Sequence, residues 1–562
     1  MKFSYPFLFI LFSISVSPLY ASGLNRNILF MIEDDGSMDY SIYGNTIIDS
    51  PNIEKLANQG TIFDNYHTSV SSCSPSRSVI MSGLPTHQNG MYGLQHSQEH
   101  FSSFDEVIGI STYLNDNNYI TGIIGKYHVW PNYVYNFTWG NNPNGPGGCQ
   151  AGASSSCPNT DYNLVSRNIT YMNEQIKNFL QYAQEQNKPW FLYIGFGDSH
   201  RCGGALGEFC ELYGYDSKTN KSSIPDWKPI QYEANDITDV PFFIQNTTIA
   251  KKDIANMYTV KNRIDQGIGL FLNTLETQFP IYNDNTLIMF TSDNGIPFAA
   301  GKTNMYEVAT IEPMIMVLPN ATKTGIRTPV LASSIDLVPT WLDWLQLPLP
   351  NYTVLGTKIV YTGKSLLPYI GTDHHNQQQS YSSTISSISY PKHRVVQSQE
   401  EIQQYMVNLP LSTTSTPLPL PKNYSKIFAS FQLHEIQEYF PMRTVIAIGD
   451  NGAHYRLIYN IAHWLPYPIA SDLWSAPATQ DLVNQYALNS STTIWYRNIS
   501  WYFYIPDART AFELYDIVND PMELQNVANN PAYSTIFTTL QQDIKTWQTV
   551  TNDDWIIKYT HE

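Results

Sequence analysis

Charged residues are scarce in this chain of 562 residues: they make up 14% of it, whereas a soluble domain usually carries about 25%. Basic residues are the scarcer kind, with 31 Lys and Arg against 48 Asp and Glu and a formal net charge of −17. Nucleic acids and anionic membranes are bound through clustered Lys and Arg, so the composition argues against both as partners. Disorder throughout is also excluded, because 42% of the residues are hydrophobic.

Long apolar runs are missing after the N-terminus, and the run at the start is short. Residues 7–16 are almost wholly apolar, Lys2 precedes them, and small residues follow at 21–23. We interpret residues 1–22 as a secretory signal peptide. The alternative, a membrane anchor, needs about 20 apolar residues, and serines and Pro18 interrupt this run. Passage through the secretory pathway also fits the Asn-x-Ser/Thr sequons. They lie at Asn136, Asn168, Asn220, Asn246, Asn320, Asn351, Asn423, Asn489 and Asn498.

Cysteines are few and odd in number, with five in the whole chain. Cys149 with Cys157, and Cys202 with Cys210, form closely spaced couples. In an oxidising compartment this spacing favours two local disulfides over the other pairings of the same four residues. Cys73 is then left without a partner.

The order of apolar segments predicts an α/β domain over residues 23–373. Short apolar runs alternate with long amphipathic stretches, which is typical of a mostly parallel sheet flanked by helices. The expected strands are residues 28–32, 120–124, 190–196, 287–290 and 314–318. The expected helices are residues 53–58, 164–186, 250–276 and 335–345.

The rest of the chain predicts an insertion and a second, smaller unit. Residues 374–430 are rich in Gln, Ser, Thr and Pro, so we expect a low-complexity surface insertion or linker there. Residues 431–562 contain further strand candidates at 443–448, 455–459 and 501–505, and a helix candidate at 536–549. That pattern predicts a small α+β domain packed on the first.

Reactive side chains follow four of the predicted strands. In open α/β sheets the ligand site lies beyond the carboxyl ends of the strands. The clusters are Asp34 with Asp35, Lys126 with His128, Asp198 with His200, and Asp293 with Asn294. Any one cluster alone could consist of ordinary polar loop residues, but four clusters at four strand ends favour one shared site.

Oxygen ligands dominate two of these clusters. Asp34, Asp35, Asp293 and Asn294 form an all-oxygen set, and adjacent carboxylates repel unless a cation lies between them. Hard oxygen donors without paired His or Cys indicate calcium or magnesium rather than zinc. The alternative is that these residues cap loops and helices.

Cys73 begins the segment Cys-Ser-Pro-Ser-Arg. Pro75 and Ser76 suit the first turn of a helix, which would place Cys73 at the helix N-terminus, where backbone N–H groups favour an anion. Arg77 adds a fixed positive charge. From these residues alone Cys73 could be a thiolate nucleophile, a structural thiol or a precursor. Together with the clusters, they indicate metal-assisted hydrolysis of an anionic ester or amide, with Lys126, His128 and His200 as proton donors and charge clamps.

The same segment resembles the sulfatase signature Cys-x-Pro-Ser-Arg, and Met81-Ser82-Gly83 stands where that family usually has Leu-Thr-Gly. Longer stretches resemble the sulfamidases within that family: residues 68–73, 83–94, 122–126, 200–203, 224–227, 290–298, 439–443 and 513–516. The resemblance implies an alkaline-phosphatase-like α/β fold. It also implies a lysosomal or secreted enzyme that releases sulfate from N-sulfoglucosamine at the non-reducing end of heparan-type glycosaminoglycans.

The resemblance also implies roles for single residues. Cys73 would be converted to Cα-formylglycine by the formylglycine-generating enzyme, and its hydrate would attack sulfur. Asp34, Asp35, Asp293 and Asn294 would bind one Ca²⁺, Arg77 would hold the hydrate, and His128 would take its proton. Lys126 and His200 would bind the sulfonate and assist the leaving amine. Asp198 and Lys302 would contact sulfate or sugar, with Lys302 in place of an expected Arg, and His434 and Glu435 would recognise glucosamine.

Other functions remain compatible with these patterns. One is a sulfatase for O-sulfate esters, and another is a phosphodiesterase or phosphonate hydrolase of the same superfamily. A third, from a different class, is a glycan-binding glycoprotein without turnover. A homodimer is expected from the resemblance alone.

Overall fold

The computed structural model describes residues 26–96, 99–202, 207–219, 221–371, 417–467, 469–488 and 509–556. The predicted signal peptide and most of the predicted insertion at 374–430 therefore lie outside the described residues, as does the strand expected at 501–505.

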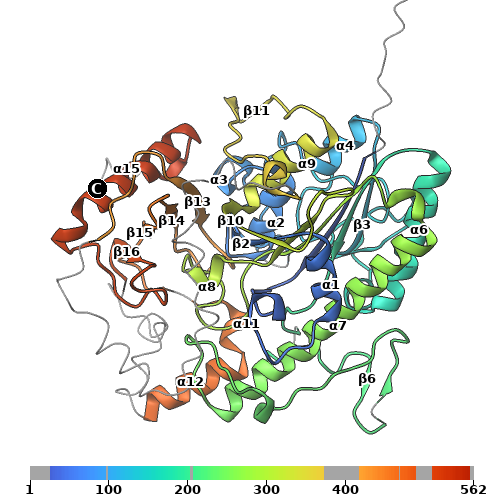
Figure 1. The fold of residues 1–562 in the computed structure, drawn as a ribbon, viewed down its shortest axis with the longest axis horizontal. Helices are drawn as coiled ribbons and strands as arrows, with labels where there is room; N and C mark the ends of the chain where they lie inside the picture. Colours follow the sequence, from blue (N-terminus) through green and yellow to red (C-terminus); the bar gives the residue numbers. More distant parts are fainter. Residues whose placement is uncertain are drawn as a thin grey trace, which may run out of the picture.

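An eight-stranded sheet forms the centre of the molecule (Figure 1), in the order β10-β2-β9-β8-β1-β5-β3-β4. Only β9 runs antiparallel to its neighbours among these pairs. The strands are β1 (Asn27–Glu33), β2 (Thr61–His67), β3 (Ile120–Lys126), β4 (Ala151–Gly152), β5 (Trp190–Gly195), β8 (Thr286–Ser292), β9 (Met314–Val317) and β10 (Ile326–Ser333). The predicted α/β class is confirmed, and each strand expected in the first domain is present.

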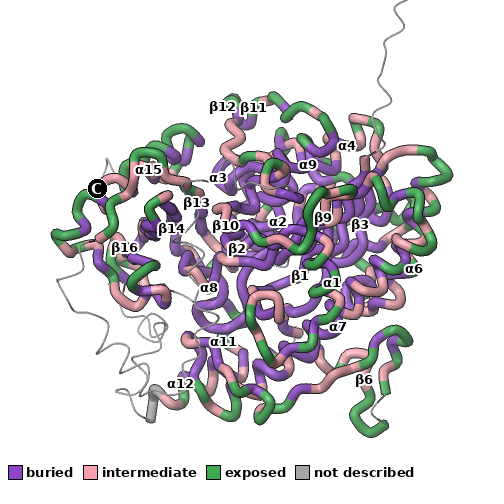
Figure 2. Tube along the Cα trace, in the orientation of Figure 1, coloured by how far each residue is buried: buried purple, intermediate pink, exposed green. Residues whose placement is uncertain are grey.

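Helices cover both faces of this sheet. Leu29 and Met31 of β1 pack with α1, α6 and α7, whereas Ile28 and Phe30 pack with α2, α4 and α9. Successive side chains of a strand point to opposite faces, so one apolar strand supplies both cores, and Figure 2 shows it buried at the centre. The helices are α1 (Pro51–Gln59), α2 (Cys73–Ser82), α3 (Thr86–Asn89), α4 (Ile110–Asp116), α5 (Tyr162–Arg167), α6 (Ile169–Gln186), α7 (Thr248–Gln278), α8 (Glu307–Thr310) and α9 (Leu337–Leu345).

One predicted helix is interrupted. Residues 164–186 form the end of α5 and all of α6, because Asn168 ends the first helix and caps the second. Its Oδ1 accepts a hydrogen bond from the Tyr171 backbone N–H at 3.1 Å. An Asn side chain competes with helical hydrogen bonding in this way, which is why Asn is favoured at helix starts.

The smaller unit is an antiparallel sheet in the order β13-β14-β15-β16, with α15 packed on one face. Its elements are β13 (Ser425–Phe431), β14 (Met442–Ile448), β15 (His454–Asn460), β16 (Phe512–Asp516) and α15 (Ser534–Val550). The helices α11 (Ser471–Trp474) and α12 (Pro477–Leu488) lie between β15 and β16 in the sequence, and α12 packs on α7 of the larger unit. β13 occupies residues that the composition assigned to the insertion, so that segment ends earlier than predicted. Two short hairpins pair β6 (Tyr215–Asp216) with β7 (Lys221–Ser222) and β11 (Thr353–Val354) with β12 (Thr357–Lys358).

Disulfides join Cys149 to Cys157 and Cys202 to Cys210, as predicted, and Cys73 is a buried free cysteine. Sequon side chains are exposed at Asn136, Asn246, Asn320, Asn351 and Asn423, whereas Asn168 is half-buried. Asn220, Asn489 and Asn498 lie outside the described residues. Among the described helices, none is both long and apolar enough to cross a membrane.

Candidate active site

Four neighbouring strands deliver the predicted clusters to one edge of the large sheet. β3, β5, β1 and β8 are adjacent and parallel, so their carboxyl ends meet. The Asp34 N–H donates to the Asp198 carbonyl at 2.9 Å, and the Asp35 N–H donates to the Asp293 carboxylate at 3.0 Å. The loops after three of these strands are therefore tied directly to each other.

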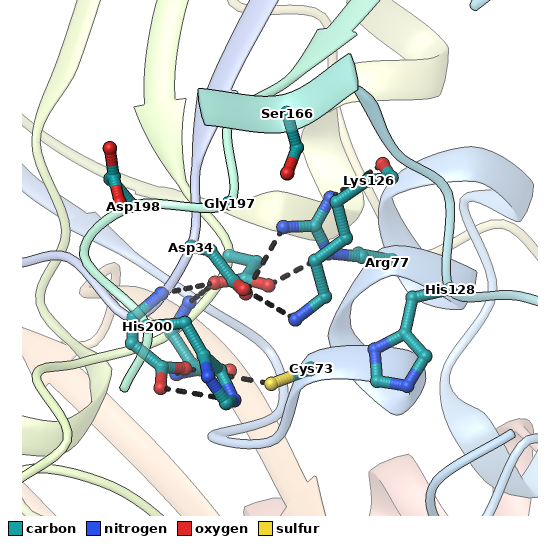
Figure 3. Close-up of polar contacts among 12 residues, drawn as sticks. Asp34, Cys73, Arg77, Lys126, His128, Ser166, Gly197, Asp198 and His200 are labelled. Carbon is teal, nitrogen blue, oxygen red and sulfur yellow. Dashed lines mark hydrogen bonds and ion pairs between the residues drawn. The ribbon is translucent and has the colours of Figure 1, made fainter. Parts of the chain in front are cut away.

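Cys73 opens helix α2 and faces this edge (Figure 3). Its side chain is 1% exposed, and its Sγ lies 3.5 Å from Asp35 Oδ1. Buried apolar residues of α2, among them Ile80 and Met81, pack against the sheet and fix the helix. Burial raises the pKa of the Cys73 thiol well above its usual value, so the site does not stabilise an ordinary thiolate there.

Arg77, one turn along α2, is enclosed by acceptors. Its Nε donates to Asp293 Oδ2 at 2.8 Å, and an Nη lies 3.3 Å from Asp34 Oδ1. Lys126 Nζ reaches the other oxygen of Asp34 at 2.5 Å. Burial alone would raise the pKa of Asp34, but Lys126, His200 and Arg77 outweigh it and hold that pKa well below its usual value. Asp34 is therefore a permanent anion.

The four oxygen-bearing residues fit a hard cation. Asn294 Nδ2 donates to Asp35 Oδ1 at 2.7 Å, but within the described residues the buried Asn294 Oδ1 has no hydrogen-bond partner. Burial raises the pKa of Asp293 to about 7, and the nearby carboxylates of Asp34 and Asp35 add to the rise although Arg77 opposes it. Ligand atoms of Asp34, Cys73 and Asp293 lie within 4.8 Å of one another. An orphaned carbonyl oxygen beside crowded carboxylates is the donor set that Ca²⁺ or Mg²⁺ satisfies.

Lys302 and His200 lie on the other side of Asp35. Lys302 Nζ is 2.9 Å from the Asp35 carboxylate and 3.3 Å from Asp472 Oδ2. His200 Nδ1 is 2.7 Å from the Arg201 carbonyl, so this nitrogen carries the proton and donates it. His200 Nε2 is left for the site, 3.8 Å from both Asp35 and Asp472.

Asp198, expected to touch substrate, is enclosed by two buried arginines instead. Arg167 of α5 lies 2.9 Å from its Oδ1, and Arg263 of α7 lies 2.8 Å from its Oδ2. The Asp198 side chain is 2% exposed, and Figure 3 shows it turned away from Cys73. This geometry suits a residue that fixes the loop carrying His200.

We therefore expect Asp198→Asn to lower stability by about 3–5 kcal/mol, because two buried guanidinium groups would lose their counter-charge. Urea unfolding followed by circular dichroism measures this, and Asp226→Asn on the exposed surface is the matched control. A variant that kept full stability but bound substrate poorly would instead support direct substrate contact.

His434 and Glu435 enter from the loop between β13 and β14. His434 Nδ1 lies 2.8 Å from Ser72 Oγ, directly before Cys73. The partly exposed Glu435 carboxylate accepts hydrogen bonds from the Ser471 backbone N–H, at 3.2 Å, and from its hydroxyl. The smaller unit thus reaches the edge of the larger sheet where Cys73 lies.

Two residues near the site were not predicted from the sequence. Asp472 belongs to the short helix α11, which carries no recognisable motif. His96 lies after the segment 83–94, and its Nδ1 is 2.6 Å from His128 Nε2. A histidine in a loop has no pattern to separate it from any other, so only the fold could reveal this pair.

Together, the mostly parallel sheet, the oxygen-rich cluster and the buried cysteine at a helix start are typical of an α/β hydrolase whose site can hold a metal ion. The family model for sulfatases matches residues 26–347. The chain is also 36% identical to human N-sulphoglucosamine sulphohydrolase, over 94% of this chain and 91% of the relative. The chain belongs to the sulfatase family.

More distant relatives show how widely the fold is used. An ulvan-active sulfatase from Formosa agariphila is 22% identical, over 94% of this chain and 75% of its own. A protein solved with its substrate D-glucosamine-2-N,6-O-disulfate superimposes with a TM-score of 0.53 at 16% identity, covering 94% and 98% of the two chains. A phosphonate monoester hydrolase of Agrobacterium radiobacter gives 0.52 at 14% identity, with 93% and 95% covered. These structures share the fold.

Proposed function

We propose that this enzyme is a sulfamidase that hydrolyses the N-sulfate of N-sulfoglucosamine at the non-reducing end of heparan-type glycans. The observation that carries the proposal is the 36% identity to human N-sulphoglucosamine sulphohydrolase along almost the whole chain. The predicted signal peptide and the sequons support an enzyme that is lysosomal or secreted.

Cys73, in this proposal, is converted to Cα-formylglycine, and Asp34, Asp35, Asp293 and Asn294 hold Ca²⁺. The hydrated aldehyde would supply a nucleophilic hydroxyl, and a cation held by these four residues would polarise the sulfonyl oxygens. The helix start and Arg77 suit this position, because backbone N–H groups and a fixed cation stabilise negative charge as it develops. The unpartnered Oδ1 of Asn294 supports the metal ligand set.

The other basic residues of the site have two roles: the lysines bind the sulfonate, and His200 assists the leaving group. Lys126 and Lys302 are buried, and attraction to Asp34 and Asp35 outweighs the effect of burial and keeps the pKa of each lysine above its usual value. Both therefore stay charged and can neutralise a sulfonate. His200 keeps its Nδ1 proton on the Arg201 carbonyl, so it can protonate the amine that leaves when the S–N bond breaks only as an imidazolium, which carries a second proton on Nε2. Burial lowers the pKa of His200, although the carboxylate of Asp35 opposes this. Asp472, beside that nitrogen, can accept an N–H of the amine.

The first test compares two substrates. The purified protein is expected to release sulfate from N-sulfoglucosamine with a kcat/KM at least about tenfold above that for an aryl sulfate, measured by ion chromatography. Efficient turnover of the aryl ester alone would refute the sulfamidase proposal and favour an O-sulfatase. Mass spectrometry of the peptide that contains residue 73 is expected to show the aldehyde, and an intact thiol in active protein would rule out the formylglycine mechanism.

A further inference from the structure

Two histidines form a hydrogen-bonded pair at the wall of the site, with their rings tilted by 37° relative to each other. His128 follows β3 and His96 lies in the loop after α3, and their ring centroids are 4.7 Å apart. Nδ1 of His96 and Nε2 of His128 are 2.6 Å apart, so one proton lies between them. His128 is 3% exposed, whereas His96 is exposed at the surface. The pair therefore connects the buried site with solvent.

The other nitrogen of His128 is the one available to the reaction. Within the described part of the chain, His128 Nδ1 is buried and has no hydrogen-bond partner. In Figure 3 the His128 ring approaches Cys73 from the side opposite His200. Because His96 occupies Nε2, a group that transfers a proton to His128 inside the site must use Nδ1.

We propose that His96 and His128 form a proton relay that carries the proton taken up at the reaction centre out to solvent. The relay deepens the proposed function and rests on it for the origin of the proton. A neutral His128 donates its Nε2 proton to His96 Nδ1 and keeps a lone pair on Nδ1. When Nδ1 accepts a proton, the Nε2 proton moves to His96 Nδ1, and His96 releases its Nε2 proton to water. Each ring ends neutral, with its tautomer exchanged.

The surrounding charges drive the proton outward. Burial, Lys126 and His96 itself lower the pKa of His128 well below its usual value, and Arg77 acts in the same direction although Asp34 opposes it. Burial also lowers the pKa of His96, together with Lys126, His200 and Lys302, while Glu99 opposes them. A proton is therefore unstable on the buried ring. Water reaches His96 and can remove it there.

His96→Gln separates a relay from a merely structural hydrogen bond. The glutamine carbonyl can still accept the Nε2 proton of His128, but an amide cannot pass a proton on. We expect kcat to fall by about tenfold to a hundredfold, with KM changed by less than about twofold. Added imidazole is expected to restore kcat in a saturable manner, because it can replace the missing acceptor. His463→Gln, at a histidine whose ring makes an edge-to-face contact with Trp464 in the smaller unit, is the matched control and should behave as wild type.

Two results would overturn the relay. Wild-type kcat in His96→Gln would show that the hydrogen bond alone matters, and a loss of kcat that imidazole does not restore would show a disturbed site. The assay uses whichever sulfate the wild type releases, so a wrong sulfamidase assignment leaves the test intact. If the wild type releases none, ¹⁵N-histidine NMR decides: a scalar coupling between the His96 and His128 ring nitrogens is expected, and its absence refutes the shared proton.

Discussion

Cys73→Ala is expected to lower sulfate release roughly 10⁴-fold or more, because the side chain that becomes the nucleophile is gone. The cost in stability should stay near about 1 kcal/mol, since the thiol is small and its contact is a weak one at 3.5 Å from Asp35. Initial rates and urea unfolding curves, measured on the same preparation, check the two halves of this expectation. A variant that fails to fold would identify Cys73 as a structural thiol instead.

Cys73→Ser tests whether the second hydroxyl of the hydrated aldehyde is needed for turnover. A serine hydroxyl can attack sulfur once, but it lacks the second hydroxyl on the same carbon that would expel sulfate. We therefore expect at most one turnover, with sulfate retained on residue 73 and visible by mass spectrometry. Multiple turnovers by the serine variant would show that the aldehyde is not required.

Removal of the metal is the second large effect. Dialysis against a calcium chelator is expected to abolish activity and to lower the thermal unfolding temperature, because the carboxylates of Asp34, Asp35 and Asp293 would repel one another without a cation. Added Ca²⁺ should restore both properties. Mg²⁺ should restore less, because it demands smaller, near-octahedral coordination. Activity that survives exhaustive chelation would contradict a catalytic metal.

Asn294→Ala tests the ligand set itself. It removes the unpartnered Oδ1, so we expect the Ca²⁺ affinity, measured by calorimetry, to fall about 10-fold to 100-fold. Asn27→Ala is the matched control, since Asn27 is a buried residue at the opposite end of β1 whose Oδ1 accepts the Trp190 N–H at 3.0 Å. That variant should lose stability and keep its calcium affinity. Equal calcium affinities in the two variants would remove Asn294 from the site.

Much of the site could be predicted from the rule that ligand sites of α/β sheets lie beyond the carboxyl ends of the strands, because such strand ends can be recognised in the local sequence. An apolar run followed by polar residues marks the end of a buried strand, and parallel strands bring such ends together, which placed Asp35 and Asp293 side by side. Strand β2 was not predicted from the sequence, because Asp64 and Asn65 interrupt its apolar pattern. In the fold, Arg327 of β10 pairs with Asp64 at 2.9 Å, a partner that no local window contains.

Long-range partners explain the remaining differences. Asp198 follows its strand as predicted, but Arg167 and Arg263 come from two different helices and enclose it. Asp472 joins Lys302 across 170 residues of sequence. Neither arrangement has a local pattern, because each depends on how elements far apart in the sequence pack together. Sequence reasoning therefore found the residues next to the reacting centre and missed those that position them.

The burial of helix α2 sets an order of events during biosynthesis. All ten residues of α2 are buried, so the proposed conversion of Cys73 to formylglycine requires that the converting enzyme reach this residue before the chain folds. The neighbours of β2 in the sheet are β9 and β10, which are made some 250 residues later. At about 5–20 residues per second, the segment around Cys73 waits roughly 10–50 s for its partners. In the proposed maturation, the order of the strands would thus give the modifying enzyme time to act.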